Sequence, residues 1–343
     1  MMRAWTVAVF FRGGGVSMLP ARRRRILLST AAVIAAPRVI AQPRAMPRIA
    51  LLSGGRQSDS ASLLNALLEG LRALGYQEGR TIEIDARYAD YSAAQAQRLA
   101  AEIAARRPTL IVTNGGGIEP AIGLSPAVPV VFVHSGNPVD AGFADSLSRP
   151  GRNATGVSLM ALDLIAKRME LLKQLRPGMR RVAFLASPEH AGQHREFAAS
   201  RAAAEQVGVD VAYHQARTPD ELAAALPKVV EGKPDGAMLF SDALMFGQRQ
   251  GLATFFLTHK IPSAAGYSAF PDSGHVLSYG PERLAVWRRI ADFVDRIIKG
   301  ARPADMPIEL PTLFELVINR RSATAMNLTL PQGLLVGADR IID

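Results

Sequence analysis

The sequence predicts an α/β protein made of two doubly wound, Rossmann-like lobes joined by a hinge. Short apolar runs alternate with helical patterns from Arg48 onward, and the same alternation starts again after residues 148–156. At 343 residues and 48% hydrophobic content, the chain also exceeds what one small core usually holds. Regular alternation of strand and helix favours parallel sheets with right-handed crossovers.

The first lobe is expected over residues 47–156. Four segments have the apolar runs or period-two alternation of strands: Ile49–Leu52, Thr81–Ala86, Leu110–Val112 and Val130–Val133. Between the first two strands, leucines recur at helical spacing up to Gly75, which is the predicted helix cap. Residues 148–156 are rich in turn formers and lack hydrophobic periodicity, so we interpret them as the link to a second lobe.

The second lobe is expected over residues 157–280. Its predicted strands are Val182–Leu185, Val209–Tyr213, Ala237–Phe240 and Val276–Tyr279. The next helix, with Trp287, Ile290 and Val294 on one face, is assigned back to the first lobe, which then includes residues 281–303. Residues 304–343 are expected to form a tail that returns across the hinge.

Residues 1–41 have the three parts of a secretory signal peptide. The basic run Arg22–Arg25 precedes the apolar run Ile26–Ala36, and Val39–Ala41 forms a possible cleavage site before Gln42. Both Sec and Tat export fit, because four arginines make a twin-arginine pair ambiguous. A membrane anchor is disfavoured because the apolar run is too short to span about 30 Å of hydrocarbon. Met18 is an alternative start.

Charge and cysteine content narrow the class of protein. Seven of the 40 basic residues precede Gln42, where there is no acidic residue, so the remainder has 33 basic and 30 acidic residues. The net charge of +10 therefore belongs largely to the leader, and nucleic acid is not an expected partner. The chain has no cysteine, which excludes disulfides, thiolate metal sites and a lipid anchor on cysteine. We expect an exported, unanchored periplasmic protein.

Polar loops follow the predicted strands, where open α/β sheets bind ligands. The candidate ligand-binding residues of these loops are Ser53, Gly54, Arg56, Asn114, Gly115, Ser135, Asn137, Ser187, His190, Ser241 and Asp242. Each loop alone is explained better by ordinary helix capping. All five loops fall at predicted strand ends, which favours a binding cleft. Tyr267 and Tyr279 are candidates for aromatic walls of the site, with packing inside a lobe as the alternative.

Motifs for cofactors, metals and catalysis are weak. Gly115–Gly117 follows a strand but lacks the G-x-G-x-x-G spacing of dinucleotide-binding loops. His190 and His194 are four residues apart, yet no third histidine is near in the sequence, so a metal site is disfavoured. No G-x-S-x-G occurs. We therefore expect no catalytic residue, no metal and no cofactor.

Three blocks carry a family resemblance. They are residues 74–89 (LGYQEGRTIEIDARYA), residues 137–156 (NPVDAGFADSLSRPGRNATG) and the tail from Pro303, including residues 314–319 (FELVIN). Together they resemble the exported family of ABC-transporter substrate-binding proteins that includes tryptophan- and tyrosine-binding members. The resemblance implies a type I periplasmic fold, with two lobes joined by three crossings. It also implies that the lobes close on a small solute for delivery to permease and ATPase subunits in the inner membrane.

One departure concerns the ligand. The family commonly has an acidic residue where this chain has Asn137, so the resemblance leaves Asp242 as the expected partner of a ligand amine, or implies a ligand that is not an amino acid. We expect a small polar or aromatic solute, an amino acid or a related compound. Three alternatives stay open: a sensory protein that signals to a membrane receptor, a hydrolase on the same scaffold, and a sugar-repressor-like regulator, which would need a DNA-binding headpiece.

Overall fold

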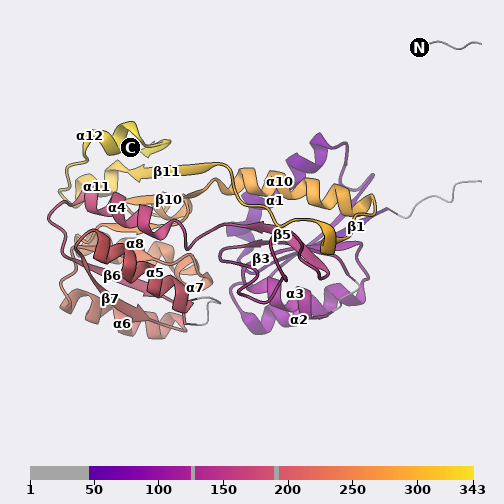
Figure 1. The fold of residues 1–343 in the computed structure, drawn as a ribbon, viewed down its shortest axis with the longest axis horizontal. Coiled ribbons are helices and arrows are strands. Elements are labelled where there is room, and N and C mark those ends of the chain that lie inside the picture. The colour runs from indigo at the N-terminus through magenta and orange to yellow at the C-terminus, as the bar shows by residue number, and fades with distance from the viewer. Residues whose placement is uncertain (1–45, 125–127, 189–192) are drawn as a thin grey trace, which may run out of the picture. The chain divides into compact units, whose positions relative to one another are not determined.

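The computed structural model describes residues 46–124, 128–188 and 193–343. Within these residues the strands form two sheets, each covered by helices (Figure 1). One sheet has five strands in the order β2-β1-β3-β4-β5, and the other has seven in the order β12-β11-β10-β9-β8-β6-β7. The first five parallel strands of the second sheet repeat the order of the first sheet, since β7-β6-β8-β9-β10 corresponds to β2-β1-β3-β4-β5. The prediction of two α/β lobes is confirmed.

The first lobe is the five-stranded sheet with its helices. Its elements are β1 (Arg48–Ser53), α1 (Gln57–Ala73), β2 (Glu83–Tyr88), α2 (Ala93–Ala105), β3 (Leu110–Asn114), η1 (Gly115–Gly117), α3 (Ile118–Leu124), β4 (Val130–His134) and β5 (Ala154–Ser158). All strand pairs in this sheet are parallel. Every residue of β4 is buried, as expected for a central strand with helices on both faces.

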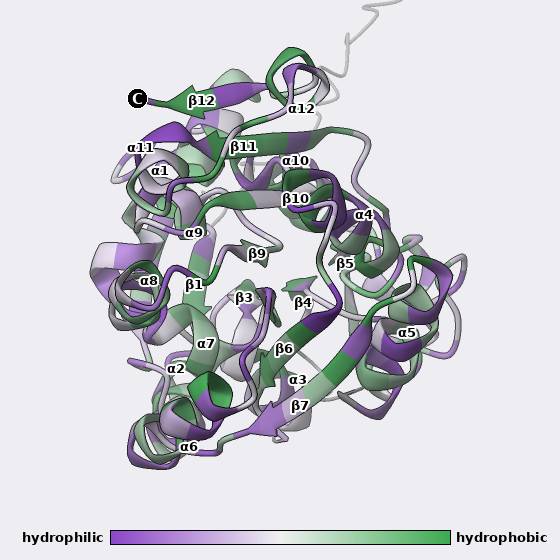
Figure 2. Ribbon diagram, turned by 90° about the vertical axis from the view of Figure 1, so that its left-hand side faces the viewer, coloured by the Kyte–Doolittle hydropathy of each residue, from purple (hydrophilic) through white to green (hydrophobic). Residues whose placement is uncertain are grey.

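The second lobe is the seven-stranded sheet with its helices. Its elements up to the end of the parallel repeat are α4 (Ile165–Leu175), β6 (Arg181–Ala186), α5 (Gln193–Gln206), β7 (Asp210–Gln215), α6 (Pro219–Glu231), β8 (Gly236–Leu239), α7 (Ala243–Gly247), α8 (Arg249–Thr258), β9 (Ser263–Ala265), α9 (Ala269–Asp272) and β10 (Leu277–Pro281). The inner strand β6 is largely hydrophobic after its first residue, whereas the edge strand β7 is hydrophilic at both ends (Figure 2). This difference fits a strand at the margin of the sheet.

The remaining elements connect both lobes. They are α10 (Arg283–Ile298), η2 (Pro303–Asp305), β11 (Phe314–Asn319), α11 (Arg320–Ala325), α12 (Gln332–Val336) and β12 (Arg340–Ile342). Helix α10 packs on α1 of the first lobe, and β11 and β12 join the sheet of the second (Figure 1). Between them, Glu309 pairs beside β5. The chain thus passes from one lobe to the other after β5, after β10 and before β11.

Helices α1 and α10 approach closely at a glycine. A side-chain carbon on Gly70 would lie 2.5 Å from the backbone oxygen of Arg288 and 2.8 Å from the Cβ of Ala291. Distances under about 3 Å cannot be accommodated by backbone, so this contact requires glycine. The apolar face of α10, which includes Trp287 and Ile290, is buried in the same core cluster as α1.

Two sequence-based expectations about the sheets are wrong. Residues 148–156 were expected to be an irregular link, but Ala154–Ser158 form β5, all buried, at the edge of the first sheet. Gly156 interrupts the strand pattern of these residues, and the structure requires a glycine there. Its φ is +151°, and a Cβ would lie 1.9 Å from the backbone oxygen of Phe132. The expected change of lobe at residues 156 and 157 therefore falls inside a strand. Likewise the second sheet is not wholly parallel, because β11 pairs antiparallel with β10.

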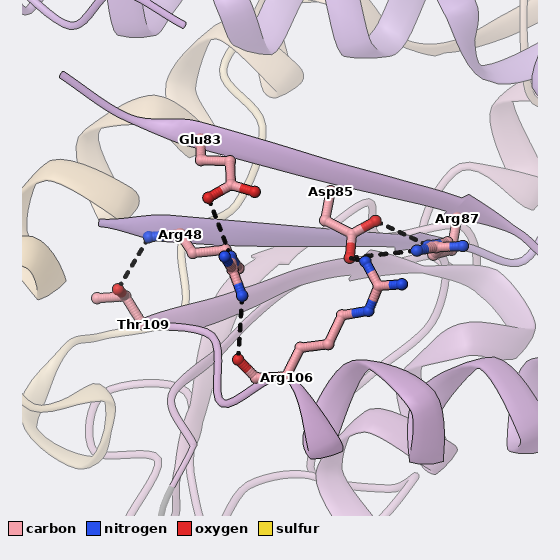
Figure 3. Close-up of polar contacts among 6 residues, drawn as sticks. All are labelled: Arg48, Glu83, Asp85, Arg87, Arg106 and Thr109. Carbon is pink, nitrogen blue, oxygen red and sulfur yellow. Dashed lines mark hydrogen bonds and ion pairs between the residues drawn. The ribbon is translucent and has the colours of Figure 1, made fainter. Parts of the chain in front are cut away.

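A polar network holds the amino-terminal edge of the first sheet, at the opposite ends of the strands from the polar loops (Figure 3). Arg48 at the start of β1 binds Glu83 at the start of β2, with 3.1 Å between Nε and Oε2. Its backbone N–H donates to the hydroxyl of Thr109, just before β3. Arg106 binds Asp85 of β2 at 3.0 Å. These contacts join the first three strands in register.

Candidate functional site

A cleft lies at the carboxyl ends of the strands and is lined by both lobes. The first lobe contributes the loops after β1, β3 and β4, and the second contributes the loops after β8 and β9. Gly54, Asn114, Ser135, Ser241 and Asp242, all predicted from the sequence, line this cleft. It holds about 740 Å³ of empty space, part of it open to solvent. The enclosed cavity volume is about 100 Å³, which is smaller than the range of about 300–1,000 Å³ that is usual for small-molecule sites.

Aromatic and aliphatic side chains form much of the cleft wall. Trp287 of α10, Phe246 of α7 and Tyr267 after β9 line it together with Tyr91. The ring centroids of Phe246 and Tyr267 are 6.2 Å apart in an edge-to-face arrangement, and those of Phe246 and Tyr91 are 6.5 Å apart. Such a wall favours a ligand with an apolar part the size of a ring.

Asp59 in the first turn of α1 is the centre of a polar group that crosses the cleft. Its carboxylate accepts a hydrogen bond from the Tyr91 hydroxyl at 2.7 Å and forms an ion pair with Arg249 of α8. Burial alone would raise the pKa of Asp59, but its hydrogen bonds from Arg249 and Tyr91 together lower it. Asp59 is therefore an ionised partner of Arg249 in the ordinary pH range. Burial also raises the pKa of Tyr91, which keeps the phenol protonated as a donor.

Arg283, the first residue of α10, places a second guanidinium in the cleft. Its Cζ lies 4.9 Å from the ring centroid of Tyr267 and 5.1 Å from that of Phe246. Both distances are within the range of cation–π contacts. Among the described residues it has no ion pair, and burial lowers its pKa. Its guanidinium therefore rests on ring faces, and the carboxylate of Asp59 acts on it without forming an ion pair.

The carboxylate of Asp242 accepts hydrogen bonds from two backbone N–H groups. One carboxylate oxygen accepts the N–H of Met245 in α7 at 2.8 Å, and the other accepts the N–H of Ser187 after β6 at 2.8 Å. Asp242 therefore caps a helix and also ties two strand-end loops of the second lobe together. Its side chain is 4% exposed, so little of the carboxylate is open to the cleft.

The other predicted residues are distributed around this cleft. Ser53 is buried behind it, with its hydroxyl 2.8 Å from that of Ser60. Gly115 lines the cleft, and Ser187 lines an adjoining hollow that shares Ser135, Ser241 and Asp242 with it.

Three predicted residues lie apart from the cleft lining, and one cannot be placed. Arg56 is exposed, with its guanidinium 5.7 Å from the Tyr91 ring centroid, and Asn137 lines a separate small hollow. Of the two predicted tyrosines, Tyr267 lines the cleft. Tyr279 stacks on Phe314 within the second lobe, with 6.3 Å between the ring centroids. His190 falls outside the described residues.

Several lining residues were not predicted from the sequence: Asp59, Tyr91, Phe246, Arg283 and Trp287. Arg249, which forms an ion pair with Asp59, was not predicted either. Asp59 lies in the helix that follows the first strand-end loop, so extending the loop rule by one helical turn would have found it. Tyr91 follows β2, and both Asp90 and Tyr91 have positive φ. No local signal marks Arg249 or Arg283, because each stands at the start of an ordinary helix.

Within residues 46–124, 128–188 and 193–343, no group of three or more His, Cys, Asp or Glu side chains is placed to hold a metal ion. In the same residues no helix is long and apolar enough to cross a membrane.

Comparisons with known proteins give consistent results. A family model described as ABC transporter substrate binding protein matches residues 59–342. A tyrosine-binding protein of Clostridioides difficile (strain R20291) is 22% identical over 263 residues, which cover 76% of this chain and 75% of that protein. Among solved structures, a conserved domain protein from Vibrio cholerae has 22% identity and a TM-score of 0.81, and covers 86% of this chain and 99% of its own. An ABC domain in complex with L-Trp from Streptococcus pneumoniae has 21% identity, the same TM-score and the same coverage.

Proposed function

Because this chain belongs to the family of ABC transporter substrate-binding proteins and has the type I periplasmic binding fold, we propose that it is the solute-binding component of an importer. It captures a small solute in the cleft between its lobes and delivers it to a permease, without transforming it. The observation that carries the proposal is the cleft itself, which is lined by strand-end loops of both lobes. A solute that contacts both lobes at once stabilises the arrangement in which they meet.

The lining supports a small solute with an apolar part. The side chains of Phe246, Tyr267 and Trp287 are part of the lining, and so are the polar residues Asn114 and Ser135. The relatives named above include a tyrosine-binding protein and a domain in complex with L-Trp. The relatives therefore favour an amino acid or a related aromatic compound, and the lining favours a solute with a ring-sized apolar part.

The place of action is proposed from the amino-terminal sequence. Residues 1–41 have the order of a signal peptide, and they lie outside the described residues. Export by the Sec or Tat route, followed by cleavage near Gln42, would deliver the two lobes to the periplasm. There a binding protein meets solutes before they reach the permease.

The test combines a thermal-shift screen of small solutes with solution scattering of the protein expressed from the full-length sequence. A solute that binds only the folded state raises the melting temperature. We expect the bound protein to have a smaller radius of gyration, because the solute bridges two lobes. An unchanged radius at saturation would contradict capture by closure.

A matched pair of glycine variants locates the binding site. Gly116 lines the cleft and Gly123 lies on the exposed side of α3, and neither has any atom within 4 Å of the position of an added Cβ. Gly116→Leu fills the cleft and should weaken binding by roughly tenfold to a hundredfold, since overpacking costs about 1–3 kcal/mol. Gly123→Leu should leave affinity unchanged. Equal affinities in the two variants would place the solute elsewhere.

A further inference from the structure

We infer that the cleft selects a solute anchored by a carboxylate group, with a ring-sized apolar body and no ammonium group. This inference rests on the proposed function and deepens it. It comes from a comparison of the charged groups around the cleft: the carboxylates are already occupied, whereas one guanidinium in the lining is without a carboxylate partner.

The two carboxylates that line the cleft have their partners within the protein. Asp59 is bound by Arg249 and by the hydroxyl of Tyr91, so its charge is neutralised by a guanidinium. Asp242 accepts backbone N–H groups with both of its oxygens and is 4% exposed. A ligand ammonium would have to compete with these contacts, which makes both residues poor anchors for an amine.

The positive charges are not matched in the same way. Arg283 lines the cleft and has no hydrogen bond or ion pair to a carboxylate among the described residues, although its guanidinium lies against two aromatic rings. A cation held in this way keeps its N–H donors for a ligand, and a carboxylate is the group that a guanidinium binds with matching geometry.

A second guanidinium lies behind the cleft, and the buried carboxylate of Glu196 acts on it. Arg168 is 3% exposed and donates to the backbone oxygens of Tyr279 and Ala161, while its Nη2 has no hydrogen-bond partner among the described residues. It lies directly behind the cleft wall, since a Cβ on Gly266 would meet both Arg168 Nη2 at 2.9 Å and Ser241 Oγ at 2.4 Å. Burial lowers the pKa of Arg168 to about 10, which still leaves it charged at neutral pH.

Charge balance then distinguishes three kinds of solute. Asp59 and Arg249 form an ion pair, and the buried carboxylate of Glu196 acts on Arg168. Asp242 is held by two backbone N–H groups, so Arg283 is the charge of the cleft lining without an ion pair among the described residues. A carboxylate without an amine neutralises this charge, a zwitterion leaves it unchanged, and an amine adds to it. In a partly buried site an uncompensated charge is costly, so the carboxylate is favoured.

The decisive experiment uses three probes with the same ring and similar chain lengths: 3-(4-hydroxyphenyl)propanoate, L-tyrosine and tyramine. The propanoate carries a carboxylate alone, L-tyrosine carries a carboxylate and an ammonium group, and tyramine carries an ammonium group alone. Affinities are measured by calorimetry at neutral pH on the protein expressed from the full-length sequence. We expect the propanoate to bind at least tenfold tighter than L-tyrosine, and tyramine to bind weakest of the three.

Two arginine variants test the assigned anchor. Arg283→Gln should weaken binding of the propanoate by at least tenfold and bring its affinity close to that of tyramine. Arg56→Gln is the matched control, because Arg56 also lies near an aromatic ring but is exposed and does not line the cleft. It should change affinity by less than threefold. Melting temperatures of both variants verify that each is folded, and Arg283→Lys provides a conservative variant that keeps the charge.

The outcomes separate this inference from the proposed function. L-tyrosine binding tighter than the propanoate, or full affinity in Arg283→Gln, would overturn the inference while leaving a solute-binding protein. Binding of sugars or amino acids with no binding of the propanoate, benzoate, phenylacetate or indole-3-acetate would do the same. If no solute of any class binds, the inference and the proposed function both fail.

Discussion

Replacing Asp59 by asparagine should loosen the contact between the two lobes at the cleft. The side chains of Asp59 and Arg249 are 11% and 21% exposed, so their ion pair is largely shielded from water. The same carboxylate also accepts the Tyr91 hydroxyl. Asparagine keeps the shape of the side chain but removes the charge that strengthens both hydrogen bonds.

The size of the effect follows from this geometry. A hydrogen bond to a charged group contributes about 1.5–3 kcal/mol, whereas a pair of exposed charges contributes about 0.2–1 kcal/mol. The shielded pair at Asp59 belongs to the first class. We therefore expect a loss of about 1.5–3 kcal/mol, and a factor of roughly ten to a hundred in any equilibrium that breaks the contact, including separation of the lobes.

A double-mutant cycle isolates the interaction. The free energy of unfolding is measured by denaturant titration for Asp59→Asn, Arg249→Gln and the double variant, and the coupling energy is the part that does not add. Scattering of the same proteins without solute should show a larger radius of gyration than the parent. The control cycle uses Arg98 and Glu102 on α2, a pair whose side chains are 65% and 46% exposed. A coupling at Asp59 as small as the control value would refute the reasoning.

Two further predictions concern stability. His275 is fully buried against the Ser263 hydroxyl, and burial lowers its pKa from 6.5 to about 4. Stability should be complete above pH 6.5 and fall by about 3 kcal/mol between pH 6.5 and 4, because only the unfolded chain takes up the proton. His275→Asn should remove that part of the slope, and identical slopes in urea titrations would count against it. Gly156→Ala should destabilise the protein by at least about 2 kcal/mol, because the added Cβ would lie 1.9 Å from the backbone oxygen of Phe132. The control Gly123→Ala, at an exposed position of α3, should stabilise the protein slightly. Similar melting temperatures of the two variants would contradict this prediction.

The sequence by itself determined the two α/β lobes, most of their strands and the loops that reach the cleft. Strands such as Val130–His134 are apolar runs bounded by turn formers, and their signal is local. Because parallel strands end at one edge of a sheet, the residues after them, such as Asn114 and Ser135, could be placed at a common site without knowing the packing. The same reasoning could not tell that Tyr279 packs on Phe314, since either role suits a tyrosine at a strand end.

Only the tertiary structure decided which charges meet in the cleft. Asp59 and Arg249 are 190 positions apart, and each lies in the first turn of a helix whose local sequence gives no sign of the other residue. Arg283 reaches the cleft because α10 crosses back onto α1, a contact made by packing between distant segments. Strand β5 was likewise hidden, since its glycine is required by the neighbouring backbone of Phe132 and not by its own turn propensity. Local patterns of apolar and turn-forming residues determine where helices and strands form and end. Ion pairs and close backbone contacts instead depend on how these elements are assembled in space.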